Sequence, residues 1–206
     1  MNKAERISDL LEWLLGKLGI TSLWYRYCNQ GEHPFGFTYP NSNQYESAHN
    51  ATDGKRYVGI IIPDARIDET IQISGKWNFD GIYLTQLKLD KLVGRGKGHV
   101  LEAEHCIFAL LHEIGHYIHF LNLPSEKEYI AFQKERLEKR EALDMRGVYK
   151  SAVRDSMSMK QRLDLEKEYL SLPGEREADL FATSMFCKIW NEYNNDFRES
   201  KTGENP

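Results

Sequence analysis

The segment from residue 100 to 122 constrains the fold more than any other part of the chain. Its apolar residues follow helical spacing but fall on nearly every side, which predicts a helix buried in the centre of the protein. Within it, residues 112–116 read His-Glu-Ile-Gly-His. Two imidazoles and a carboxylate are costly to bury without partners. The motif therefore predicts a bound cation, in preference to two isolated core histidines.

The HExxH spacing indicates a zinc ion and a separate role for each of the three polar residues. His112 and His116 lie one helical turn apart on the same face, so their imidazoles can converge on a single Zn²⁺. Glu113 is rotated from His112 by about 100° around the helix axis, which does not suit a third ligand. It can instead reach a water held by the metal and accept its proton. We expect His112 and His116 to be metal ligands and Glu113 to be the catalytic base.

A catalytic zinc site needs a third protein ligand. An HExxHxxGxxH pattern does not supply it, because His119 and Asn122 occupy its two later positions. His119 lies two turns, about 10.5 Å, from His112 along the helix, which is too far for both to bind one ion. We expect His119 at the rim of the site.

The predicted helix at 174–192 offers a better third ligand. Its apolar stripe, extended backwards by helical spacing, runs through Glu175 and Asp179. The stripe consists of Ala178, Ala182, Met185, Phe186 and Ile189. Two inward carboxylates are costly unless a metal and its histidines offset the cost. Glu175 is expected to bind zinc, and Asp179 to accept the free imidazole N–H of His112.

Two questions stay open at the level of sequence. Glu175 also fits a helix-start carboxylate that the helix dipole alone would favour. An oxyanion donor cannot be assigned by spacing, and its candidates are His99, His105, Tyr117 and Tyr169.

The rest of the chain predicts an α+β fold in a single domain, residues 1–206. A small, mostly antiparallel three-stranded sheet would pack on the buried active-site helix, together with an N-terminal helix and C-terminal helices. Residues 29–56 lack periodicity and predict a long loop, and the charged segment 125–171 predicts a helical insertion. The remaining expected elements are a helix at 3–19, strands at 21–28, 57–62, 69–74 and 81–84, and helices at 125–146 and 155–171.

Composition excludes several classes of function. The net charge of −4 argues against direct nucleic-acid binding. No apolar stretch approaches the roughly 20 residues that a membrane-spanning helix needs, and the N-terminus lacks the features of a secretory signal. Cys28, Cys106 and Cys187 form no CxxC pair and lie in apolar surroundings, so we expect buried reduced thiols in a cytoplasmic protein.

Two motifs together resemble those of a known family. The HEIGH sequence at 112–116 and the sequence EREADLFA at 175–182 resemble the ImmA/IrrE family of zinc metallopeptidases, gluzincin-like proteins with an ExEA[ND]xFA pattern. The match places Glu175 and Asp179 at that pattern's first Glu and its Asp/Asn. The resemblance implies a zincin-like fold and a cytoplasmic zinc endopeptidase that cuts a specific protein, often a transcriptional repressor. The segment 125–171 makes the gap between His116 and Glu175 long for this family.

Two alternatives accompany this interpretation. The chain is also compatible with a non-catalytic, zinc-containing interaction module, an inhibitor or sensor on a peptidase scaffold, whose segment 125–171 binds a protein partner. Solvated helix faces explain the charges of that segment equally well. A protease of another HExxH family is the third possibility.

Overall fold

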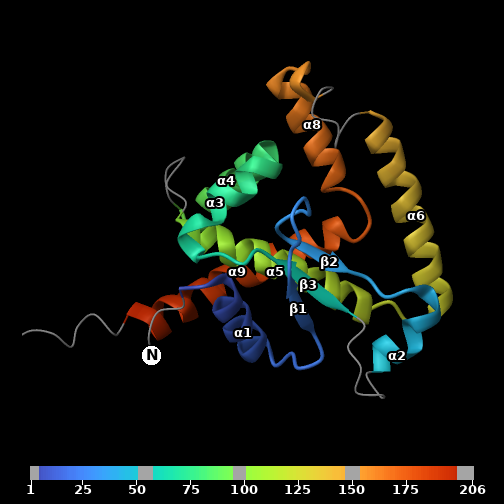
Figure 1. Cartoon of the computed structure of the whole chain (residues 1–206), viewed down its shortest axis with the longest axis horizontal. Coiled ribbons are helices and arrows are strands. Elements are labelled where there is room, and N and C mark those ends of the chain that lie inside the picture. Colours follow the sequence, from blue (N-terminus) through green and yellow to red (C-terminus); the bar gives the residue numbers. More distant parts are fainter. Residues whose placement is uncertain (1–4, 51–57, 95–100, 147–153, 199–206) are drawn as a thin grey trace, which may run out of the picture.

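Helix α5, Glu102–Leu121, runs through the middle of the molecule in the computed structural model of the chain (Figure 1). The structure describes residues 5–50, 58–94, 101–146 and 154–198. Ile107, Leu110 and Ile114 of α5 have no exposed surface. The prediction of a central buried helix is therefore confirmed.

A three-stranded sheet lies beside this helix in the order β1-β3-β2. β1, Trp24–Tyr27, pairs in parallel with β3, Gly59–Ile62, and β2, Gly36–Thr38, pairs antiparallel with β3 on its other side. The fold class is α+β, as predicted, but the sheet is mixed and not mostly antiparallel. Its third strand comes from the segment 29–56, where the sequence predicted only a loop.

The two strands predicted at 69–74 and 81–84 are wrong. A 3-10 turn at Ile67–Glu69 leads into α3, Thr70–Trp77, which is followed by α4, Phe79–Leu92. The apolar patterns of 69–74 and 81–84 are so short that they fit the period of a helix as well as that of a strand. The contacts at the helix starts therefore decide between the two. The Glu69 carboxylate accepts the Arg66 N–H at 2.8 Å, and the Asn78 side chain accepts the Gly81 N–H at 3.0 Å.

Helices account for the remaining elements (Figure 1). The N-terminal helix α1, Ile7–Leu18, and the charged helices of the segment 125–171 form as predicted. Those charged helices are α6, Glu126–Met145, and α8, Met159–Tyr169. A 3-10 turn, Ser42–Gln44, and the short helix α2, Tyr45–Asn50, lie within the segment 29–56, and α9, Glu175–Arg198, ends the described chain.

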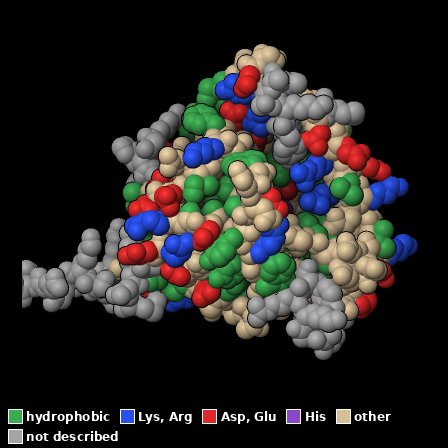
Figure 2. Space-filling model, viewed as in Figure 1, with side chains coloured by type: hydrophobic (Ala, Val, Ile, Leu, Met, Phe, Trp, Pro, Cys, Tyr) green, Lys and Arg blue, Asp and Glu red, His purple; other side chains and the backbone are tan. Residues whose placement is uncertain are grey.

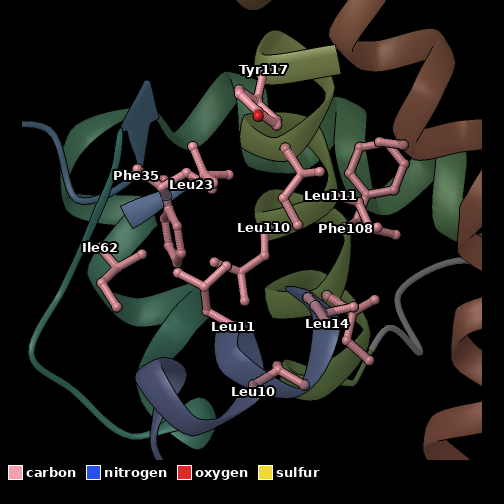
Figure 3. Packing of buried hydrophobic residues seen from close by; sticks show 14 of the residues in the cluster. Leu10, Leu11, Leu14, Leu23, Phe35, Ile62, Phe108, Leu110, Leu111 and Tyr117 are labelled. Carbon is pink, nitrogen blue, oxygen red and sulfur yellow. The ribbon is translucent and has the colours of Figure 1, made fainter. Parts of the chain in front are cut away.

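The core forms where α1 meets α5. Leu10, Leu11 and Leu14 of α1 are fully buried, and in Figure 3 the Leu11 side chain lies beside Leu110 of α5. This main cluster draws on residues from the first helix to the last. A second, small cluster belongs to the segment 125–171 and the turn after it, and consists of Leu143, Leu165 and Leu172.

The three cysteines differ in burial. All three cysteines are free, but Cys106 is buried, Cys28 is half-buried and Cys187 is exposed, so the expectation of three buried thiols is wrong. Within the described ranges, no helix is both long enough and apolar enough to cross a bilayer. On the face shown in Figure 2, acidic and basic side chains are interspersed.

Candidate metal centre

Helix α5 places the two motif histidines as helical spacing predicts. The rings of His112 and His116 lie with their centroids 4.9 Å apart and their planes perpendicular. The His116 side chain is buried and the His112 side chain is nearly so, with 6% and 16% of their surfaces exposed. The central position of α5 therefore shields both imidazoles from most of the solvent.

A close helix crossing brings α9 onto the same face of α5. A Cβ atom built on Gly115 would lie 2.7 Å from the Cα and the carbonyl oxygen of Ala178, closer than real contacts allow. The glycine inside the HExxH motif thus permits the backbones of α5 and α9 to touch. Glu175 lies one helical turn before Ala178, so the crossing carries its carboxylate over the histidines.

The turn before α9 determines where the helix that carries the third ligand, Glu175, begins. Gly174 has φ +87°, a conformation that favours glycine, and its N–H donates to the Glu177 carboxylate at 2.8 Å. This contact starts the helix immediately before Glu175. Glu177 caps the helix through this contact and is not one of the three residues of the histidine–carboxylate group.

The three side chains converge on one point. Glu175 Oε2 lies 3.3 Å from His112 Nε2 and 3.5 Å from His116 Nε2, and all three ligand atoms lie within 4.8 Å of one another. Ligand atoms about 2.1 Å from a tetrahedral ion are about 3.4 Å apart. The donor set therefore fits a small divalent cation, and His112, His116 and Glu175 form a group able to hold a metal ion.

The charges of the three side chains also favour a bound cation. Burial alone would raise the pKa of Glu175, but the two imidazoles outweigh it and hold that pKa well below its usual value. Burial likewise acts to lower the pKa of His112, and the Glu175 carboxylate together with Glu113 overcomes it and raises that pKa. The anionic oxygen facing two imidazole nitrogens attracts positive charge, whether a proton or a metal ion.

Glu113 occupies the position expected of a proton acceptor. Its side chain is buried beside the cluster, and it is not one of the three convergent ligands. Burial raises the pKa of its carboxyl, Glu175 adds to this, and the nearby His116 and His112 oppose it. A carboxylate with a raised pKa is a stronger base at neutral pH than an ordinary glutamate.

Asp179 has a different partner from the one predicted. Its carboxylate pairs with the Lys88 ammonium of α4, and no hydrogen bond joins it to His112 in the part of the chain that the structure describes. Asp179 acts on His112 only through space, by raising its pKa. The expected contact fails because α4 brings a cation to the same carboxylate, which the sequence of α9 does not reveal.

Two aromatic residues at the site, Phe37 and Tyr39, were not predicted from the sequence. The Phe37 ring stacks on the His116 ring with centroids 5.9 Å apart and planes 24° apart. The Tyr39 hydroxyl lies 3.1 Å from His116 Nδ1. Aromatic residues at positions 35, 37 and 39 carry the period of a strand, and this signal identifies β2.

The other candidate residues have their own contacts. Tyr117 pairs with Ser22, and Tyr169 packs on the small second cluster. His105 is buried, and its Nδ1 has no hydrogen-bond partner in the part of the chain that the structure describes. His119 contacts the Phe132 ring, with centroids 4.9 Å apart. Within the described ranges none of these four joins the metal cluster, and His99 lies outside those ranges.

No match to this chain was found among protein-family models, curated proteins or solved structures. The candidate site therefore stands on its own geometry. That geometry comprises two imidazoles, one carboxylate and an adjacent buried glutamate.

Proposed function

We propose that the chain is a zinc-dependent endopeptidase with a zincin-like fold. The observation that carries this proposal is the convergence of His112 Nε2, His116 Nε2 and Glu175 Oε2 on one point. Two histidines and one carboxylate are a known donor set of catalytic zinc sites, which keep a fourth position for water or substrate. The resemblance of residues 112–116 and 175–182 to ImmA/IrrE peptidases agrees with this donor set.

The chain's own residues supply the proton transfers of peptide hydrolysis. Bound zinc supplies Lewis acidity, which polarises a carbonyl and activates water. Glu113 accepts a proton from the attacking water as the new C–O bond forms. It then passes this proton to the amide nitrogen, so the C–N bond breaks and a neutral amine leaves.

The sheet offers a place for an extended polypeptide. β2 lies at an edge of the sheet and is paired with β3 on one side. An edge strand presents free backbone groups to which a peptide can add. That Phe37, in β2, stacks on His116 supports binding of a protein segment along this edge. The substrate that we propose, a transcriptional repressor in the cytoplasm, rests on the motif resemblance.

Zinc content is the first test of this function. The purified chain is expected to retain one zinc ion after dialysis against metal-free buffer, because three buried donors hold it. His116→Ala and Glu175→Ala each remove one donor and are expected to lose the ion, while Glu138→Gln, an exposed change on α6, retains it. A wild-type chain without zinc, or variants that hold as much as wild type, contradicts the proposal.

Proteolysis is the second test. The zinc-loaded chain is expected to cut members of a proteome-derived peptide library, and Glu113→Gln to cut them about 10²–10⁴ times more slowly. Zinc content should stay unchanged in this variant, because Glu113 is not a ligand. Equal cleavage by wild type and Glu113→Gln rules out the assigned mechanism.

One observation favours the alternative of a non-catalytic interaction module. Ile130 and Leu137 of α6 are exposed by 46% and 51%, and they lie seven positions apart, so they share a helix face. Such a face suits a protein partner. If this is the main function, Ile130→Lys with Leu137→Lys abolishes the effect of the chain in cells, whereas Glu113→Gln leaves it intact.

A further inference from the structure

The metal ligand His116 has a hydrogen-bonding partner behind it. Its Nε2 faces the metal point, and its Nδ1 lies 3.1 Å from the Tyr39 hydroxyl. An imidazole that binds a metal through Nε2 carries its proton on Nδ1. His116 Nδ1–H then donates, and the Tyr39 oxygen accepts. This contact fixes both the tautomer and the rotation of the ring.

Tyr39 is itself held from several sides. It follows β2, two residues after Phe37, so both rings lie on one face of the strand and contact each other with centroids 4.8 Å apart. Phe132 of α6 packs against it at 5.5 Å. A Cβ atom on Gly174 would lie 3.1 Å from its hydroxyl oxygen. The phenol therefore has little freedom to leave His116.

Helix α6 adds a cation to this arrangement. The Arg136 guanidinium carbon lies 4.8 Å from the centroid of the Tyr39 ring, on the side of the helical insertion. A guanidinium at this distance attracts the ring face electrostatically. The insertion thus contacts the residue that contacts the metal ligand.

We propose that Tyr39 is a positioning residue for the metal ligand His116, and that α6 holds Tyr39 in place through Arg136. This inference rests on the zinc site of the proposed function. It assigns the insertion a role at the metal centre. The neutral phenol oxygen takes the place that a carboxylate or a backbone carbonyl occupies behind many metal-bound histidines.

The affinity of the chain for zinc tests the proposal directly. We would measure it by competition with a chromogenic chelator for wild type, Tyr39→Phe and Tyr45→Phe. Tyr45→Phe is the matched control, since its buried hydroxyl also donates a hydrogen bond, to the Leu123 carbonyl, away from the metal point. Tyr39→Phe is expected to weaken zinc binding about tenfold and Tyr45→Phe less than about twofold.

A second readout separates positioning from general stability. The visible spectrum of the cobalt-substituted chain reports the ligand geometry, and it is expected to change in Tyr39→Phe and not in Tyr45→Phe. A purely structural role for Tyr39 would lower the melting temperature of the metal-free chain and leave both zinc affinity and spectrum unchanged.

Zinc affinity decides between the outcomes. A loss of zinc affinity of about fivefold or more that is confined to Tyr39→Phe supports the proposal. A smaller loss, or an equal loss in Tyr45→Phe, overturns it. If wild type binds no zinc, the proposed function and this inference fail together, whereas normal binding by Tyr39→Phe removes this inference alone.

If Tyr39→Phe does not fold, Arg136→Met takes its place. Weaker binding than in Lys134→Met supports the proposal, and equal binding overturns it.

Discussion

At the scale of single residues, burial decides how the ionisable groups of α5 behave. Burial raises the pKa of the Glu113 carboxyl, and the nearby His116 and His112 oppose this rise. His105, two turns before His112, is also buried, and among the described residues its Nδ1 has no hydrogen-bond partner. The same helix therefore contains a buried histidine that faces a carboxylate, His116 with Glu175, and a buried histidine, His105, that faces none among the described residues.

His105 predicts a specific loss of stability in acid. Burial lowers its pKa from 6.5 to about 4 in the folded chain. In the unfolded chain the His105 imidazole binds a proton at higher pH than in the folded chain. The folded state therefore has its full stability, as far as His105 is concerned, above pH 6.5, and it loses stability as the pH falls towards 4. The full loss is about 3 kcal/mol.

Chemical denaturation across this pH range, compared between wild type and His105→Gln, checks the prediction. The metal cluster titrates in both proteins, so the difference between them isolates His105. We expect the free energy of unfolding to fall more steeply in wild type than in His105→Gln. Parallel curves for the two proteins would show that His105 takes no part in acid unfolding.

At the scale of elements, the crossing of α5 and α9 creates the site. Neither helix holds a complete set of ligands, and the set is completed where Gly115 lies against Ala178. The buried apolar stripe of α9 keeps the two helices in contact over their length. Ala178, Ala182, Phe186 and Ile189 form this stripe and are at most 1% exposed.

Gly115→Ala is expected to damage this crossing. The added methyl would meet backbone atoms of Ala178, which cannot rotate away, so the helices must separate and the chain should lose about 2–3 kcal/mol of stability. Because Glu175 moves with α9, zinc affinity should fall as well. Thermal unfolding and zinc competition measure the two effects.

Gly16→Ala is the matched control for this prediction. Gly16 lies in α1, and an added Cβ has no atom within 4 Å. This change should leave zinc affinity unaltered and raise stability by about 0.5–1 kcal/mol through helix propensity. If Gly115→Ala behaves like Gly16→Ala, the backbones of α5 and α9 do not touch at this crossing.

At the scale of the whole molecule, the contacts that attach the charged helices α6 and α8 to the rest of the described chain include one group at the site and another at α4. The middle of α6 contacts the site through Phe132 and Arg136, which both lie against Tyr39. The second attachment joins α8 to α4 through an ion cluster, in which Arg154 contacts Asp80 at 2.7 Å and Glu166 at 3.3 Å. Both carboxylates are buried, so this contact is more than a surface ion pair.

Arg154→Met is expected to destabilise the chain by about 3 kcal/mol, because it leaves two buried carboxylates with less compensation. Lys167→Met removes an exposed ion pair of α8 and should cost about 0.5 kcal/mol or less. Denaturant unfolding of both variants tests this difference. Equal stabilities would mean that Arg162, 3.2 Å from Asp80, compensates the cluster alone.

Local periodicity in the sequence determined much of this protein. The 3.6-residue repeat is a property of the backbone, so it revealed α1, α5 and α9, put His112 and His116 on one face, and drew attention to Glu175. It failed at 69–74 and 81–84, where short apolar runs fit two periods and the side-chain caps of Glu69 and Asn78 favour helix.

Contacts between distant segments were decided only by the tertiary structure. Tyr39 behind His116, Lys88 on Asp179 and Arg136 over Tyr39 each join residues far apart in the chain. Periodicity shows which side of an element faces inward, but it does not show which element lies there. That depends on how the packed helices and strands fill the interior together, and it therefore becomes visible only in three dimensions.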